Sequence, residues 1–257
     1  MTRLLLVVFL LLVGLLVYGR IDRAGTTPGT SVVVESLPQG PASATAGPAT
    51  APDIVASGGT PAMDLLARLE GRRRLVRAAR TTYFDSLFVE TDSVVRRWPD
   101  QQGMVFVVAI PPDTAQTDTP LRDIILRALT AWQAAGLGLQ FTLSTDTTGA
   151  NIVAYSTPFL GQDRGGQTDL QWTRDGAIQS AVITLARRDS VGRVLPAPML
   201  QAVAVHEIGH ALGLSHSPST ADVMYGVTNT ATPSIRDVAT LTLLYQLPLG
   251  TIREKVP

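Results

Sequence analysis

The chain has 257 residues, 45% of them apolar, which is enough for one well-buried domain with extensions but short for two full domains. Its 21 basic and 21 acidic side chains balance, so no electrostatic feature predicts a nucleic-acid partner. The chain contains no cysteine, which excludes disulfides, thiolate zinc sites and cysteine nucleophiles.

The N-terminus has the pattern of an export signal. Arg3 supplies a positive charge, and an apolar run extends from Leu4 to Tyr18, slightly shorter than the about 20 apolar residues of a membrane-spanning helix. This pattern predicts that residues 1–20 are a signal peptide or an N-terminal membrane anchor. We therefore expect a secreted or extracytoplasmic protein whose only membrane contact is through this segment.

Two further segments precede the predicted compact domain. Residues 21–60 are rich in Pro, Gly, Ala and Thr and predict a flexible linker, because such a composition cannot bury enough surface to offset its ordering entropy. Residues 61–97 predict a helical N-terminal extension or a propeptide, with a basic face that we expect to be solvated. Its apolar positions form an imperfect stripe at Leu65, Leu66, Leu69, Val76 and Ala79.

Residues 98–257 combine strand and helix signals in an order that predicts an α+β domain, a mixed twisted sheet backed by helices. A β-rich run at 104–110 precedes a helix that begins near Pro120 and ends near Gly136. Further strands are predicted at 139–143, 152–155, 169–173 and within 177–186. An active-site helix that includes 199–205 and a C-terminal helix after Pro233 complete the domain. Ser234 and Asp237 predict a capping box at the start of this last helix, and its buried stripe is predicted at Ile235, Val238 and Leu241.

All three histidines of the chain lie within one eleven-residue segment, HEIGHALGLSH, from His206 to His216. His206 and His210 are four residues apart, which places both on one face of a helix. Gly213 is suited to end that helix with a positive φ, and the resulting turn would bring His216 back to the same ion. The three histidines are therefore predicted to be the ligands of one metal ion.

This ligand set predicts a catalytic zinc site. Three neutral imidazoles leave the fourth position of tetrahedral Zn²⁺ open for water, and zinc makes this water acidic enough to supply hydroxide near neutral pH. Glu207 follows the first ligand, and from this position on a helix its carboxylate is expected to reach the zinc-bound water without ligating the metal. It is therefore predicted to be the general base that takes the proton as water attacks a peptide carbonyl.

The extended segment HEIGHALGLSHS resembles the zinc motif of metzincins, and Ser217 after the third histidine is similar to the matrixin branch. Met224, in the segment ADVMYG, resembles the methionine that lies beneath the zinc ligands in this clan. The resemblance covers residues 98–248, although only 206–226 is specific. It implies a zinc-dependent endopeptidase that binds extended protein substrates along an edge strand, for which 169–173 is the candidate.

Several alternatives remain beside this interpretation. The chain lacks the cysteine with which animal matrixins block their zinc, and no histidine is left for a second zinc. Asp163, Asp169 and Asp175 offer a possible calcium site, although scattered surface carboxylates are favoured.

A non-catalytic zinc-containing binding module is a second hypothesis for the function, which the presence of Glu207 disfavours. An amidase acting on cell-wall peptides is a third. The expected partner is a protein or peptide substrate, and a monomer is expected.

Overall fold

The structure is a computed structural model that describes residues 40–41, 64–99, 105–112 and 120–252. The predicted signal or anchor segment 1–20 and nearly all of the predicted linker 21–60 lie outside these described residues. Within the described part of the chain, no helix has both the length and the hydropathy needed to cross a membrane.

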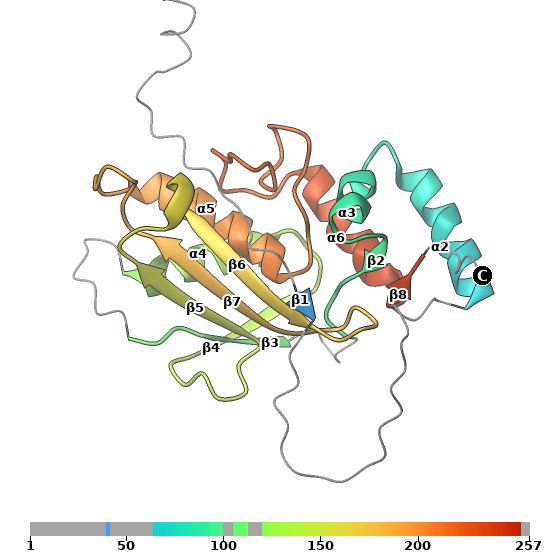
Figure 1. The fold of residues 1–257 in the computed structure, drawn as a ribbon, viewed down its shortest axis with the longest axis horizontal. Helices are drawn as coiled ribbons and strands as arrows, with labels where there is room; N and C mark the ends of the chain where they lie inside the picture. Colours follow the sequence, from blue (N-terminus) through green and yellow to red (C-terminus); the bar gives the residue numbers. More distant parts are fainter. Residues whose placement is uncertain (1–39, 42–63, 100–104, 113–119, 253–257) are drawn as a thin grey trace, which may run out of the picture. The chain divides into compact units, whose positions relative to one another are not determined.

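One sheet of six strands forms the centre of the fold, in the order β1-β6-β7-β5-β3-β4 (Figure 1). Four strands run parallel, and β6 runs antiparallel to its neighbour β7. The short β1 pairs in parallel with the outer edge of β6 at Gln171 and Trp172 only. The bounds are β1 Gly40–Pro41, β3 Val105–Ala109, β4 Gln140–Ser144, β5 Ile152–Thr157, β6 Gly166–Trp172 and β7 Ile178–Ala186.

Helices α4 (Leu121–Ala134) and α5 (Ala197–Ala211) pack against each other and against the sheet (Figure 1). Alternation along the strands turns Phe106 and Val108 into the core, because successive side chains of a strand point to opposite faces. All six apolar positions of the predicted stripe on α4 are buried, as the helical spacing requires, and they are Leu121, Ile124, Ile125, Ala128, Leu129 and Trp132. The mixed sheet backed by helices is therefore the architecture that the sequence predicted.

The segment predicted as one helical extension contains two helices, α2 (Leu65–Ala78) and α3 (Phe84–Glu90), followed by the short strand β2 (Val94–Val95). Strand β2 pairs with β8 (Gly250–Thr251) near the end of the chain. Tyr83, Phe84, Leu87 and Val95 are buried in the same core as the sheet and its helices. Residues 83–95 thus contribute side chains to this core.

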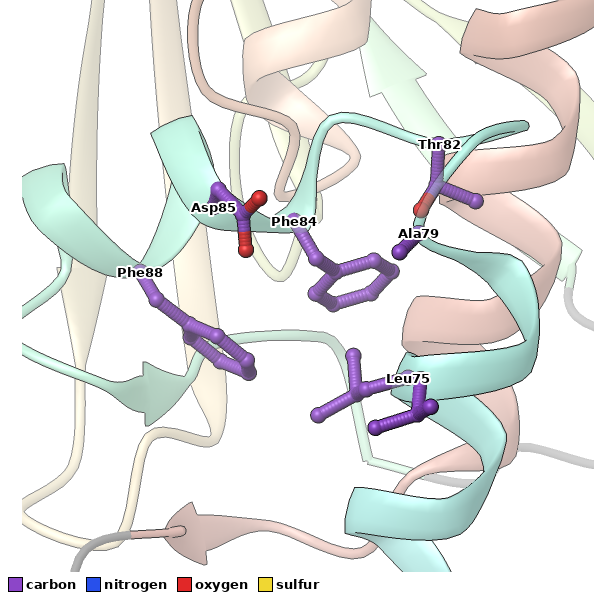
Figure 2. A pocket seen from close by; sticks show the side chains of 7 residues that line it. Leu75, Ala79, Thr82, Phe84, Asp85 and Phe88 are labelled. Carbon is purple, nitrogen blue, oxygen red and sulfur yellow. The ribbon is translucent and has the colours of Figure 1, made fainter.

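The apolar stripe predicted on α2 is exposed, with Leu66 at 77% and Val76 at 78% of full exposure. The face that packs inward instead carries Gly71. A Cβ atom at this position would be in van der Waals contact with the side chains of Leu247 and Ile252. Figure 2 shows the aromatic rings of α3 and Leu75 of α2 around a cavity of about 160 Å³ between the two helices.

The C-terminal helix α6 (Ile235–Gln246) begins with the expected capping box. The Ser234 hydroxyl accepts a hydrogen bond from the Asp237 amide at 3.0 Å, and the Asp237 carboxylate accepts one from the Ser234 amide at 2.7 Å. The predicted burial of Ile235 is wrong, because this side chain is 88% exposed. Leu241 is buried as predicted, and the other buried residues of α6 are Asp237, Thr240, Leu243 and Leu244.

Candidate metal centre

Helix α5 carries the first two histidines and ends where the sequence predicted. Leu212 is its C-cap, and Gly213 follows with a φ of +103°. The amide of Gly213 donates to the carbonyl of His210 at 2.8 Å, and the amide of Leu214 donates to the carbonyl of Gly209 at 3.0 Å. This pair of bonds is a Schellman motif, which satisfies carbonyls that a helix end leaves without partners. The chain then turns sharply toward His216.

The turn brings the three predicted ligands together. The ligand nitrogens of His206, His210 and His216 all lie within 4.8 Å of one another, and the Nε2 atoms of His206 and His210 are 2.9 Å apart. Two nitrogens bound tetrahedrally to one zinc at the usual bond length would lie about 3.3 Å apart. The rings therefore converge at nearly the separation that a shared ion requires.

Hydrogen bonds on the far side of each ring set the tautomers of the two helical histidines. Nδ1 of His206 lies 2.7 Å from the carbonyl oxygen of Val223, and Nδ1 of His210 lies 2.8 Å from that of Leu214. A carbonyl oxygen can only accept, so each Nδ1 carries the hydrogen and each Nε2 presents its lone pair inward. Such backbone partners orient a ligating imidazole and raise its basicity.

Burial keeps the two helical imidazoles neutral. It lowers the pKa of His206 to about 3, with a further lowering from the charge of His216. Burial also lowers the pKa of His210 well below its usual value, helped by the charges of the other two histidines. At neutral pH both rings are unprotonated, which is the state that binds a metal ion.

The donor set fits a zinc ion. Nε2 of His216 is buried without a hydrogen-bond partner among the described residues, and the facing lone pairs of His206 and His210 leave a place for a cation. Three imidazole nitrogens with an open side are the ligand set of catalytic zinc sites. The three histidines are the one group of potential metal ligands that gathers within the described ranges, and the predicted calcium candidates Asp163, Asp169 and Asp175 do not assemble there.

Glu207 lies on α5 beside this cluster and is completely buried. Its Oε2 accepts a hydrogen bond from the hydroxyl of Thr168 on β6, whereas Oε1, in the described part of the chain, has no hydrogen-bond partner. Burial raises the pKa of Glu207 to about 8, against the opposing effect of the Thr168 hydrogen bond. A cation bound by the histidines would favour the ionised carboxylate.

Thr168 and Gly166 are contacts of Glu207 that the sequence did not single out. The Thr168 hydroxyl also lies 3.0 Å from the Glu207 carbonyl, so β6 is tied directly to the active-site helix. A Cβ atom on Gly166 would lie 2.5 Å from Oε1 of Glu207 and 2.7 Å from Val203. Because residue 166 is glycine and has no Cβ, the space that the Glu207 carboxylate occupies is free.

We expect the Gly166→Ala substitution to lower peptidase kcat/KM by about 100-fold, because displacing a reacting group by about 1 Å has an effect of this size. The measurement is hydrolysis of a quenched fluorescent peptide by zinc-loaded protein. Gly161→Ala, five residues earlier in the chain, is the control, since a Cβ there meets nothing within 4 Å. Equal activity of the two variants would show that Glu207 tolerates the added methyl group.

Met224 lies against α5 at Gly209. It is fully buried, and a Cβ on Gly209 would lie 2.2 Å from its sulfur. The neighbouring Ser217 amide donates to the Met224 carbonyl at 2.8 Å. The thioether thus fills the space next to Gly209 of α5, for which its flexibility suits it.

The predicted edge strand lies beside the same cluster. It spans Gly166–Trp172 rather than 169–173, and it runs antiparallel to β7. Beyond the contact with β1 at Gln171 and Trp172, no other strand of the described residues pairs with its outer edge. The free part of the edge is therefore the part nearest Glu207.

Glu90, at the end of α3, is a further side chain that the sequence did not connect with the site. Its Oε1 lies 3.5 Å from Nδ1 of His216, and its Oε2 accepts a hydrogen bond from the His216 amide at 3.4 Å. Burial opposes ionisation of Glu90, but hydrogen bonds from His216 and Ser215 outweigh it and lower the pKa. Glu90 could not be found from the sequence, because 126 positions separate it from His216.

Comparison with known proteins agrees with this geometry. Among the curated proteins, no relative matches the chain. Residues 167–246, which include β6 except its first residue, α5, the three histidines and α6, match the family model described as Matrixin. This part of the chain is therefore a matrixin-like domain, of the kind found in metallopeptidases.

Proposed function

We propose that the protein is a zinc-dependent endopeptidase in which His206, His210 and His216 hold the metal and Glu207 is the general base. The observation that carries this proposal is the convergence of three imidazole side chains. The buried Glu207 is next to His206 in the sequence, and its Oε1 has no hydrogen-bond partner among the described residues. A purely structural zinc site has four protein ligands and needs no base, so the arrangement favours catalysis over a binding module.

Zinc, when bound, would supply Lewis acidity that lowers the pKa of a water molecule and polarises the peptide carbonyl. The chain's own residues then move the protons. Oε1 of Glu207 takes a proton from the attacking water and returns it to the leaving amine, while the Thr168 hydroxyl holds Oε2. Glu207 is completely buried, and its contacts with β6 fix the orientation of its carboxylate.

The free edge of β6 supports an extended peptide as the substrate. A peptide that pairs with this edge would gain main-chain hydrogen bonds that do not depend on its sequence. The edge begins at Gly166, next to Glu207, so a paired peptide would present its carbonyls to the histidine cluster. Such binding accommodates unfolded or flexible protein segments and also the peptides of a cell wall.

The test is hydrolysis of unfolded casein by the purified full chain. We expect cleavage that a chelator such as 1,10-phenanthroline abolishes and that added Zn²⁺ restores, because the histidines are the metal ligands. A non-chelating phenanthroline isomer is the control. Casein cleavage that survives complete removal of the metal, verified by elemental analysis, would contradict the proposal. Cleavage of cell-wall peptides but not of casein would favour the amidase hypothesis.

A further inference from the structure

The third histidine differs from the other two in what holds it. Nδ1 of His206 and of His210 each face a backbone carbonyl, and both residues stand on the rigid helix α5. His216 follows the helix on a loop, its ring is 28% exposed, and its Nδ1 faces the Glu90 carboxylate. The orientation of this one ring therefore depends on a side chain from a distant segment.

A glutamate at the position of Glu90 is unfavourable for the stability of its own helix. It is the last residue of α3, where the negative end of the helix dipole disfavours a carboxylate. After the C-cap residue Thr91 come two non-glycine residues with positive φ, Asp92 at +52° and Ser93 at +63°. Left-handed backbone of this kind is costly and persists only where the surrounding structure holds it.

Core packing and hydrogen bonds hold the rest of α3 in place. Phe84 and Leu87 are buried in the common core, and the amide of Thr91 caps the helix on the carbonyl of Leu87 at 2.9 Å. Tyr83, just before α3, donates its hydroxyl to Asp237 of α6 at 3.1 Å. Asp237 in turn accepts from the amide of Val223 at 2.9 Å, the residue whose carbonyl orients His206.

We propose that Glu90 is a positioning residue for the third zinc ligand, and that residues 64–97 consequently remain part of the working enzyme. This inference rests on the proposed zinc site. The carboxylate accepts the Nδ1 hydrogen of His216, fixes the ring and leaves Nε2 for the metal, and it also holds the His216 amide. Carboxylate partners of this kind raise the basicity of a ligating imidazole.

The first experiment measures zinc affinity of the full chain by competition with a chromophoric chelator. Glu90→Ala is expected to weaken Zn²⁺ binding by about 10- to 100-fold, the usual effect of removing such a partner. Glu90→Gln is expected to fall between wild type and Glu90→Ala, because its amide oxygen still accepts a hydrogen bond without the charge. Asp85→Asn, which removes an exposed carboxylate from the same helix, is the control and should match the wild type.

A structural role alone would lower stability and leave the metal unaffected, so thermal unfolding of the metal-free variants is recorded alongside. We expect unchanged melting for Glu90→Gln and a changed absorption spectrum of the cobalt-substituted protein. Zinc affinity of Glu90→Ala within about twofold of wild type overturns the inference while the proposed function stands. Failure of the wild type itself to bind zinc overturns the proposed function instead.

The second experiment identifies the N-terminus of the active form by mass spectrometry. Active protein is expected to retain Glu90, because without it His216 loses the carboxylate that contacts its Nδ1 and its amide. A fully active form whose chain begins after residue 97 would overturn the inference. It would show that α2 and α3 are dispensable.

Discussion

Glu207→Gln is expected to lower the peptidase kcat by about 10²- to 10⁴-fold, the range over which general-base catalysis accelerates reactions, while zinc binding stays within a few-fold of wild type. The amide has the size of the carboxylate and can still accept the Thr168 hydroxyl hydrogen bond, so the change removes the base without creating a cavity. Peptide hydrolysis and zinc content are measured on the same samples. Glu70→Gln, an exposed glutamate on α2, is the matched control.

The same variant has a pH signature in the metal-free protein. The pKa of Glu207 is raised by burial to about 8, so between its ordinary pKa and pH 8 the folded state holds a proton that the unfolded state releases. Stability of the wild type relative to Glu207→Gln should therefore fall as pH rises through this window. An equal pH dependence of the two unfolding free energies, or full activity of Glu207→Gln, would refute the assigned role.

Gly213→Ala is expected to destabilise the protein by about 2–4 kcal/mol, because it combines backbone strain with a steric clash. The residue has a φ of +103°, and an added Cβ would lie 2.7 Å from the carbonyl oxygen of Arg96 and 3.2 Å from Leu244. Relief of this clash would also shift the turn that leads to His216, so zinc affinity should fall. Urea unfolding and chelator competition measure the two effects.

Gly136→Ala measures the effect of backbone strain without a steric clash. Gly136 follows the end of α4 with a similar φ of +77°, but a Cβ there meets nothing within 4 Å. Its substitution should cost only about 1 kcal/mol and leave zinc binding unchanged. Equal unfolding free energies for the Gly213 and Gly136 variants would mean that the turn at Gly213 is not sterically constrained.

Prediction from the sequence succeeded where the determinants lie close together along the chain. The apolar spacing of α4, the glycine that ends α5 and the capping box of α6 are all local signals, and each has the predicted conformation. The histidine cluster is also local, because four-residue helical spacing and one turn are enough to bring three rings together.

The same reasoning failed where the answer depends on the neighbours of an element. Leu66, Val76 and Ile235 are apolar but exposed, whereas the inward face of α2 carries Gly71. Apolar periodicity identifies a stripe, but the partner that packs on a helix decides which face is buried. For α2 that partner is the end of the chain near Leu247 and Ile252, about 180 residues away.

The eleven residues from His206 to His216 were enough to predict the histidine cluster and the turn that forms it, since their geometry follows from one helix and its end. The surroundings that complete the site come from elsewhere: Gly166 and Thr168 from β6, Glu90 from α3 and Val223 from the loop before α6. Contacts between segments this far apart are created only when the core of the domain assembles. Side-chain packing, rather than spacing along the chain, therefore decides how the histidines and Glu207 are held.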